Sequence, residues 1–519
     1  MDTKALRQKV LDLAIRGKLV PQDPSDEPAS VLLERIRQQK QQMVKEGKLK
    51  AKDIKNDTII FAGEDNLHYE KFADGSVKCI EDEIPFDLPD GWAWSRLVSL
   101  SSIITDGEHK TPRRINEFQG YYLLSARNIQ NGFISLGDVD FVDKCEFENI
   151  SKRCNPKEDD VLISCSGSIG RVAVVNDSNN YVMVRSAAMV RPIIIKPNYL
   201  MFALQSGQLQ TQMQKASKQT AQANLFLGAI QSLLIPVPPE IEEQRIIRVA
   251  GEAISIANEI EQNRESVSRT ILQAKSKILD LAIRGQLVPQ DSDDEPAAVL
   301  LERIRAEKEE LIKQGKIQRD KKESVIFRGE DNSYYFDIPN TWMLCPLKEL
   351  FNVCSAKRVR QSDWRTEGVP FYRAREIVKL SDNGFVDNNL FISEEHYMRV
   401  KTECGVPEPG DLMVSGVGTI GKVYVVNSDD RFYYKDASVL CFENRTGVID
   451  SHFARYMLES EFIQAQMKDN SKGTTVDTIT ISAAMEYVCV LPPLAEQKRI
   501  VSAIETAFTQ LKSISEALS

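Results

Sequence analysis

Apolar residues in the middle of the chain recur at alternating intervals of four and three positions. This spacing is typical of a helix that buries one seam in a coiled coil. It predicts a single helix from about residue 241 to 284, roughly 65 Å long at about 1.5 Å per residue. Gly285 and Pro289 predict its end. Arg264 takes the one polar place in the seam, whose apolar members are Ile246, Ala250, Ala253, Ala257, Ile260, Val267, Ile271, Ala274, Ile278 and Leu281.

Two other stretches of the chain show mixed α and β patterns. Runs rich in β-branched residues at 161–175, 181–192 and 412–426 predict strands joined by tight turns. Helical patterns follow at about 198–216 and 451–468. We therefore expect an α+β (mixed α/β) fold in each stretch.

The chain is built from two copies of one unit. Residues 9–37 and 277–305 are identical at 24 of 29 positions, at an offset of 268. Further matching blocks start at Asp160 and Asp411, and at Pro236 and Val490. Between these blocks, the segments 95–235 and 346–489 agree at only a few positions, which predicts two similar scaffolds that carry two different surfaces.

The second copy of the long helix is divided between the two ends of the chain. Residues 496–519 match its first half, and residues 2–16 match its second half. The 3/4 spacing continues at Val501, Ile504, Phe508, Leu511 and Leu518, and resumes at Leu6, Val10 and Leu13. We expect a pseudo-twofold molecule with adjacent termini, in which the central helix packs antiparallel against the divided one.

This organisation predicts five segments. Helical segments alternate with two globular domains, and the last helix completes the second helical segment. The predicted boundaries are 1–83 for the N-terminal helical half-repeat, 84–238 for the first globular domain, 239–335 for the central helical region, 336–492 for the second globular domain and 493–519 for the C-terminal helix.

Composition excludes several classes of protein. With 519 residues, 42% hydrophobic and 27% charged, the chain has the composition of a folded globular protein and not of a disordered or collagenous one. No apolar run is long enough to cross a bilayer and the first residues are charged, so we expect a cytoplasmic protein with no membrane partner. Nine cysteines without a C-x-x-C pair predict neither a zinc site nor a disulfide framework.

Charge alone does not indicate a nucleic-acid partner, because the net charge is −9. Local groups of cations do. Like charges within one loop repel one another unless an anion neutralises them, so these groups are better explained by a polyanion than by solvent. They are Lys110, Arg113, Arg114 and Arg127 in the first segment, and Lys357, Arg358, Arg360, Arg365, Arg373 and Arg375 in the second.

Two glycine-containing hairpins could also contact a DNA backbone. The sequences S-G-S-I-G-R (166–171) and G-V-G-T-I-G-K (416–422) resemble a phosphate loop, but Val423 stands where that loop needs Ser or Thr, and a β run follows. We expect tight β-turns that present Ser168, Arg171, Thr419 and Lys422. Two later loops add Lys218, Lys472 and Thr474 as donors to phosphates or base edges.

Motifs for catalysis are missing from the sequence. There is no D-P-P-Y-type or N-P-P-Y-type tetrapeptide, no complete Walker A motif, no H-E-x-x-H and no G-x-S-x-G. None of the four histidines stands near a matched nucleophile. We expect no catalytic residues and no bound metal, and therefore a recognition protein that is not itself an enzyme.

The chain resembles the DNA-specificity subunits of type I restriction-modification systems. The resemblance is carried by the paired P-P-…-E-Q segments (238–244 and 492–497), the two S-x-x-G-[ST]-I-G-[RK]-V hairpins, D-G-E-H-K-T-P at 106–112, and the duplicated L-D-L-A-I-R-G-x-L-V-P-Q-D block. It covers essentially the whole chain. An alternative interpretation, a scaffold whose heptads and paired domains bind proteins, remains open at this point.

The resemblance implies a function and a set of partners. The two globular domains would be target-recognition domains separated by helical spacers. Each would read one half of an asymmetric, interrupted site on double-stranded DNA. Two methyltransferase subunits would bind the helices, and two ATP-driven restriction and translocase subunits would join them. This chain would hold no cofactor, because S-adenosylmethionine, ATP and Mg²⁺ would be bound by the partners, and the methyltransferase would flip the target adenine.

Residues that match in both copies cannot distinguish two different half-sites. Arg127 and Arg375, and likewise Arg171 and Lys422, are therefore expected to maintain the fold or contact phosphates. Positions that differ are the better candidates for base contacts. These are Ser125 against Arg373, Asn128 against Glu376, and His109 and Lys110 against Lys357 and Arg358.

Overall fold

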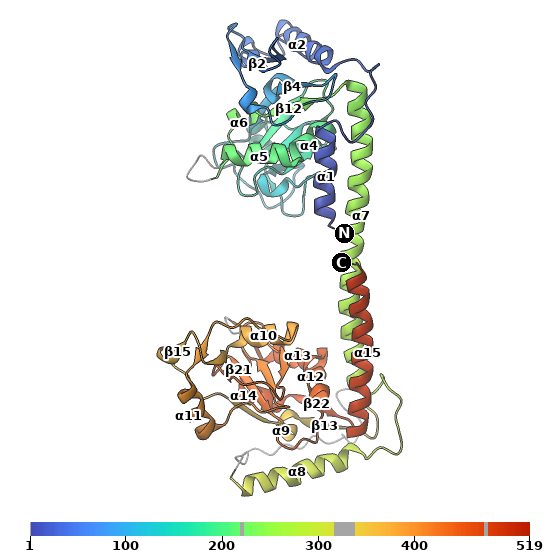
Figure 1. Ribbon diagram of the computed structural model, residues 1–519, viewed down its shortest axis with the longest axis vertical. Coiled ribbons are helices and arrows are strands. Elements are labelled where there is room, and N and C mark those ends of the chain that lie inside the picture. Colours follow the sequence, from blue (N-terminus) through green and yellow to red (C-terminus); the bar gives the residue numbers. More distant parts are fainter. Residues whose placement is uncertain (1, 218–222, 316–337, 472–475, 519) are drawn as a thin grey trace. The chain divides into compact units, whose positions relative to one another are not determined.

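The computed structural model describes residues 2–217, 223–315, 338–471 and 476–518. The chain forms two compact units, Met1–Asn263 and Arg264–Ser519. The division falls inside the long helix α7 (Glu240–Ile283), so each unit contains about half of it (Figure 1). The observed bounds of α7 agree with the helix predicted from the heptad spacing, and Gly285 follows its end with a φ of 67°.

In the first unit, α1 (Thr3–Ile15) packs antiparallel to the start of α7 (Figure 1). The direction follows from two ion pairs. Arg7 in the first half of α1 contacts Glu261, whereas Asp26, beyond the end of α1, contacts Arg245 near the start of α7. Val10, Leu11, Ala14 and Ile15 share a buried core with Ile246 and Ala250 of α7. The predicted seam is thus occupied by a helix from the other end of the sequence.

The second unit repeats this pairing with α15 (Leu494–Leu518). The Nζ atom of Lys275 lies 5.3 Å from the ring centroid of Phe508, and Leu279 packs in one core with Ile500 and Ile504. Residue numbers fall on α15 as they rise on α7, so these helices are also antiparallel. Each terminal helix therefore completes the coiled-coil pair of its own unit.

Each unit is centred on a four-stranded antiparallel sheet of the same order. In the first unit the order is β5-β11-β8-β9, and in the second it is β14-β21-β18-β19. The strands are β5 (Ser101–Asp106), β8 (Val161–Ser164), β9 (Val172–Val174) and β11 (Ala187–Pro192), and β14 (Asn352–Ser355), β18 (Leu412–Ser415), β19 (Val423–Val425) and β21 (Val439–Glu443). The α+β fold class and the two related globular domains are confirmed.

Smaller sheets and helices surround these central sheets. In the first unit they are α2 (Ala29–Lys45), η1 (Ala51–Ile54), β1 (Ile59–Ala62), β2 (His68–Lys71), β3 (Val77–Cys79), η2 (Glu81–Glu83), β4 (Ala93–Arg96), η3 (Leu97–Leu100), β6 (Tyr121–Leu124), η4 (Ala126–Asn128), β7 (Asp140–Phe141), α3 (Lys144–Ser151), β10 (Asn180–Met183), α4 (Pro197–Gln205), α5 (Gly207–Ser217), α6 (Leu227–Gln231) and β12 (Leu234–Val237).

In the second unit the surrounding elements are α8 (Ala297–Lys313), β13 (Met343–Pro346), α9 (Leu347–Leu350), η5 (Gln361–Asp363), β15 (Trp364–Arg365), β16 (Val369–Tyr372), α10 (Ala374–Asn383), β17 (Phe391–Ile392), α11 (Glu394–Cys404), β20 (Tyr433–Tyr434), α12 (Ser451–Glu459), α13 (Glu461–Ser471), α14 (Ile481–Glu486) and β22 (Val488–Leu491). In both units a two-stranded sheet, β12-β4 or β13-β22, joins the entry and exit of the domain.

A buried tryptophan joins each recognition domain to its long helix. The indole nitrogen of Trp92 donates to Glu242 at 3.0 Å, and that of Trp342 donates to Glu496 at 2.8 Å. Burial raises the pKa of both carboxyl groups, because the charged form loses its hydration. The two copies therefore align as Glu242 with Glu496. Matching the E-Q dipeptides would instead align Glu243 with Glu496 and require one extra residue in the first copy.

The helical stretches predicted at 198–216 and 451–468 are each interrupted by one serine. Ser206 separates α4 from α5, and Ser460 separates α12 from α13; both adopt extended backbone angles. The hydroxyl of Ser206 donates to the Ala203 carbonyl at 2.6 Å, and that of Ser460 does the same to Met457. The apolar periodicity extends across this break, because both short helices face the same core.

The remaining organisational predictions concern how parts of the chain are placed. The pseudo-twofold axis and the adjacency of the termini involve both units together, and residues 1 and 519 lie outside the described residues. These expectations and the five segment boundaries stay predictions.

Candidate DNA interface

The two glycine-containing hairpins are tight β-turns with the same internal bonds. In the first, the Ser164 hydroxyl donates to the Ser168 carbonyl at 2.6 Å, and in the second Ser415 donates to Thr419 at the same distance. Gly167, Gly170, Gly418 and Gly421 all have positive φ values. A strand follows each turn, not a helix, so neither is a phosphate loop of the nucleotide-binding type.

A glutamine under each turn supports it. The side-chain amide of Gln210 donates to the Gly170 carbonyl at 2.7 Å and to Leu204, while Gln464 donates to Gly421 at 2.9 Å and to Leu458. The breaks at the two serines bring these glutamines below the hairpins. They were missed from the sequence, although they occupy matching places four residues after Ser206 and Ser460.

The hairpins present their predicted contacts differently. Ser168 and Thr419 are exposed at the tips of the turns. Arg171 and Lys422 are half-buried, and the Lys422 Nζ atom lies 2.6 Å from the Asp382 carboxylate. Both cations stand directly after the second glycine of the turn, where they could reach a phosphate beside it.

The first basic group shares acidic partners. Lys110, Arg113 and Arg114 are exposed on the loop after β5. The Arg114 Nε atom lies 2.8 Å from Asp140, which also accepts from Arg127 at 2.9 Å. Arg127 also lies 3.5 Å from Asp138, so two carboxylates orient these two guanidinium groups and balance their charge locally. The exposed side chains of Lys110 and Arg113 add positive charge to the same loop.

Asn128 occupies a buried position, not a surface one. Its side chain is 1% exposed, accepts from Ser125 through both the amide N–H and the hydroxyl, and donates to the carbonyls of Ser135 and Asp138. All of its ordinary hydrogen bonds are used within the domain. This arrangement does not support the predicted base contact of Asn128. The amide instead fixes the loop at Ser125 through the two hydrogen bonds that it accepts there.

Glu376 plays the corresponding part in the second unit. It is 3% exposed and accepts from the Arg373 backbone at 3.0 Å and from the side chains of Arg373 and Arg375. Despite burial, these bonds lower the pKa of its carboxyl group. Its predicted base contact is likewise not supported, since the carboxylate is already surrounded by its own donors.

Other cations of the second unit remain accessible. The Arg358 side chain is 83% exposed, and its nearest acidic contact, Asp436, is at 4.0 Å. Lys357 is exposed and pairs with Glu403, and Arg360 is exposed next to η5. Lys218, Lys472 and Thr474 lie outside the described residues, so their predicted contacts stay predictions.

Strand register corrects the pairing of the loops after β5 and β14. Asp106 pairs with Ala188 in β11, and Ser355 pairs with Leu440 at the matching place in β21. Counting from these residues, His109 corresponds to Arg358. This count differs by one position from the pairing of His109 with Lys357 expected from the sequence.

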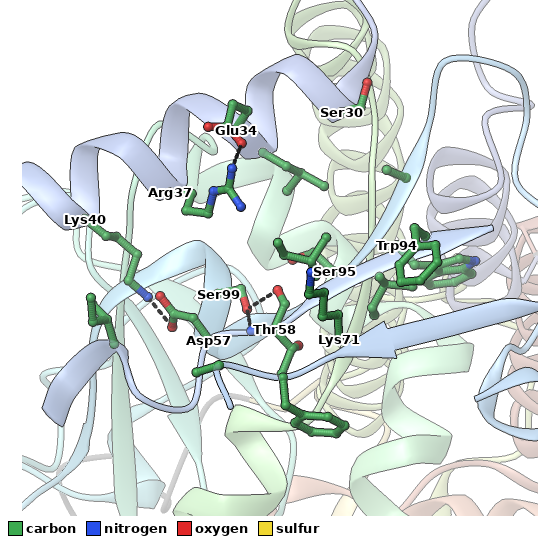
Figure 2. Close-up of a pocket in the computed structure, with 18 of the residues that line it drawn as sticks. Ser30, Glu34, Arg37, Lys40, Asp57, Thr58, Lys71, Trp94, Ser95 and Ser99 are labelled. Carbon is green, nitrogen blue, oxygen red and sulfur yellow. Dashed lines mark hydrogen bonds and ion pairs between the residues drawn. The ribbon is translucent and has the colours of Figure 1, made fainter. Parts of the chain in front are cut away.

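A pocket in the first unit lies away from these residues. It has a volume of about 680 Å³ and lies between α2 and strands β1, β2 and β4, where Figure 2 shows Lys40 pointing toward Asp57. The Lys40 Nζ atom lies 2.7 Å from Asp57 and 2.9 Å from the Val98 carbonyl. None of the predicted DNA contacts that fall within the described residues lines this pocket.

No cluster of three or more His, Cys, Asp or Glu side chains in the described ranges is arranged to hold a metal ion. Among the helices that the structure describes, none combines the length and apolar character needed to span a bilayer.

Two copies of one scaffold with different exposed polar groups define a bipartite recognition protein. Residues 89–267 and 339–518 match the family described as "Type I restriction modification DNA specificity domain". Because these matches cover more than half of the chain, the protein belongs to this family and is a DNA-specificity subunit with two recognition domains.

Curated relatives agree with this membership over nearly the full length. The chain is 25% identical to the type I restriction enzyme EcoAI specificity subunit of Escherichia coli, over 97% of this chain and 88% of that protein. It is 24% identical to the EcoEI specificity subunit of the same species, over 98% and 90%. A similar fold occurs in a structure described as showing complex assembly and conformational transition of the type I R-M system, with a TM-score of 0.52, 16% identity and coverage of 84% and 94%.

Proposed function

We propose that the two recognition domains read the two halves of one asymmetric, interrupted DNA site, and that the helices set the distance between them. The helices would also bind two methyltransferase subunits, to which two restriction and translocase subunits would be added. S-adenosylmethionine, ATP and Mg²⁺ would be held by those partners, so this chain would act without a cofactor and without catalysing a step. The complex would work in the cytoplasm.

One observation carries the proposal: equivalent places in the two domains hold different exposed side chains. His109 and Arg358 follow equivalent strands at the same distance, and they differ in charge and hydrogen-bonding pattern. Arg171 and Lys422, in contrast, are both cations after the same turn. A shared backbone contact with a different base contact in each domain is what a bipartite asymmetric site requires.

The two kinds of contact have different physical consequences. Cations that neutralise phosphates release counterions, so they raise affinity for every sequence and make it fall with salt. Side chains that meet base edges contribute roughly 1 to 3 kcal/mol of discrimination each. The matching cations would therefore supply affinity, and the differing positions would supply selectivity.

The test is methylation mapping combined with a binding titration. The full chain is produced together with its methyltransferase subunit in a host without other adenine methylation, and methylated adenines are sequenced. The purified complex is then titrated with a fluorescent duplex carrying the mapped site, at several salt concentrations. We expect one interrupted asymmetric sequence, with affinity that falls steeply as salt rises.

Two results would contradict the proposal. One is methylation without any shared sequence, and the other is equal affinity for the mapped site and for a duplex with both half-sites scrambled. A complex that binds peptides but no duplex would favour the protein-binding scaffold instead.

A further inference from the structure

The loop after β5 contains a histidine that is fixed at one nitrogen and open at the other. The His109 Nε2 atom lies 2.7 Å from Oδ2 of Asp106, whose side chain is only 17% exposed. The imidazole itself is 53% exposed, and no contact of its Nδ1 atom is described. Asp106 therefore fixes the ring through Nε2, and Nδ1 stays available for another partner.

The loop around this histidine is rigidly built. A Cβ atom on Gly107 would lie 2.2 Å from the Met183 carbonyl oxygen, so only glycine fits there. The Glu108 backbone N–H donates to that same carbonyl at 2.7 Å, and the Glu108 carbonyl accepts from Arg185. Gly107 and Glu108, the two residues before His109, are therefore fixed by the backbone of Met183 and Arg185. Their fixed backbone sets the direction of the His109 side chain.

Arg153 completes the arrangement. It pairs with Oδ1 of Asp106, and its Nε atom donates to the carbonyl oxygens of Gly107 at 3.1 Å and Asp106 at 3.3 Å. A guanidinium can only donate, so Arg153 occupies one carboxylate oxygen and leaves the other for His109. Arg153 was missed from the sequence because it follows α3, 47 residues from Asp106.

These contacts decide the tautomer of the neutral imidazole. Nε2 lies near both Asp106 and the Arg153 Nη2 atom, at 2.7 and 3.0 Å, and cannot donate to one while accepting from the other. The carboxylate contact is the stronger because the acceptor is charged. Nε2 therefore carries the proton and Nδ1 is left as a hydrogen-bond acceptor.

We propose that Asp106 is a positioning residue which makes His109 an acceptor for a base amino group in the first half-site. In the major groove the amino groups are N6 of adenine and N4 of cytosine, whereas guanine O6 and thymine O4 are acceptors that this nitrogen would repel. The assignment depends on the proposed contact between this loop and DNA. The second domain has Arg358 at the same distance from its strand, so it would read its half-site without an oriented histidine.

The decisive variant is Asp106→Asn, because it is nearly the same size and reverses the tautomer. Arg153 still needs an acceptor, so the Asn carbonyl oxygen faces it and the Asn amide donates to Nε2. The proton then moves to Nδ1, which becomes a donor. We expect the preference at one position of the first half-site to change from adenine or cytosine to guanine or thymine, by roughly 5- to 150-fold.

The experiment uses the complete complex with its methyltransferase and a duplex library randomised over the mapped site. Glu108→Gln is the matched control, because it removes the same charge from the same loop and keeps the acceptor for the Lys110 N–H. It should leave the base preference unchanged. His109→Ala should lose the preference at the one affected position and keep the second half-site.

The outcomes separate this inference from the proposed function. If the wild-type complex selects no sequence, the proposed function fails. If it selects an interrupted site but Asp106→Asn selects the same bases with the same strength, the tautomer assignment is wrong. Weaker selection at every position of both half-sites by Asp106→Asn would also contradict it, since that result indicates a general loss of structure.

Discussion

At the scale of single residues, Glu243 occupies a place where the second copy has an amide. Gln497 donates to the Pro492 carbonyl at 2.9 Å and accepts from the Asp450 N–H at 2.8 Å. Glu243 accepts from the Lys196 N–H at 2.7 Å and is fully buried. Burial raises the pKa of Glu243 to about 8, so at neutral pH it is a carboxylic acid that takes the place of the amide.

Replacing this acid should change how stability depends on pH. Below the ordinary glutamate pKa, folded and unfolded chains both hold the proton; as pH rises toward about 8 only the folded chain keeps it, so stability falls. At about 1.4 kcal/mol per pH unit, the loss amounts to roughly 5 kcal/mol above that pH, and about 3 kcal/mol of it falls between pH 6 and pH 9. We expect Glu243→Gln to remove it, measured by calorimetry of the full chain at pH 6 and pH 9. Glu252→Gln, at an exposed site on the same helix, should keep the wild-type profile.

Gly17 tests a second residue-scale constraint. It ends α1 with a φ of 62°, and a Cβ atom there would lie 2.5 Å from Cγ of Pro89. Gly47 has a similar φ of 72° with nothing within 4 Å. Gly17→Ala should therefore cost more than the roughly 1 to 2 kcal/mol of left-handed strain that Gly47→Ala costs, as measured by thermal unfolding. Equal losses would show that Pro89 moves aside freely.

At the scale of elements, the long helix is the part whose length the function should depend on. A seven-residue insertion lengthens a helix by about 10 Å, which equals roughly three base pairs of B-DNA. We expect one heptad inserted between residues 255 and 275 to change the gap in the methylated site and leave both half-site sequences intact. Methylation mapping measures both.

The control is an insertion of the same length at Gly75, in the turn between β2 and β3. A Cβ atom on Gly75 would have no neighbouring atom within 4 Å, so the turn has room for added residues. It should leave the gap unchanged. An unaltered gap after the heptad insertion would defeat the idea that helix length sets the spacing.

The elements also show where periodicity predicts a helix well and where it does not. The heptad seam predicted α7 within one residue at each end, because a 3/4 spacing sustained over many turns keeps one continuous helical face buried. The breaks at Ser206 and Ser460 were not predicted, since each pair of short helices keeps its apolar face toward one core. The breaks place Gln210 and Gln464 under the hairpins, a contact between distant parts of the chain that periodicity cannot predict.

At the scale of the whole molecule, the repeat makes a prediction about symmetry. A chain in which 346–489 replaces 95–235 would carry two identical recognition surfaces. If the scaffold is pseudo-twofold, as the divided helix predicts, this chain should direct methylation to an inverted repeat of the second half-site. Methylation mapping distinguishes that result from a direct repeat, which would contradict the predicted symmetry.

Sequence alone determined the duplicated organisation, the long helix, the α+β class and the family, because each depends on order and periodicity along the chain. It also located the loops that carry cations. It could not determine which of those side chains are free to meet DNA, since burial depends on distant partners. Tertiary structure placed Asn128 and Glu376 inside the domain and brought Arg153 to Asp106. Such contacts join residues that only folding brings together.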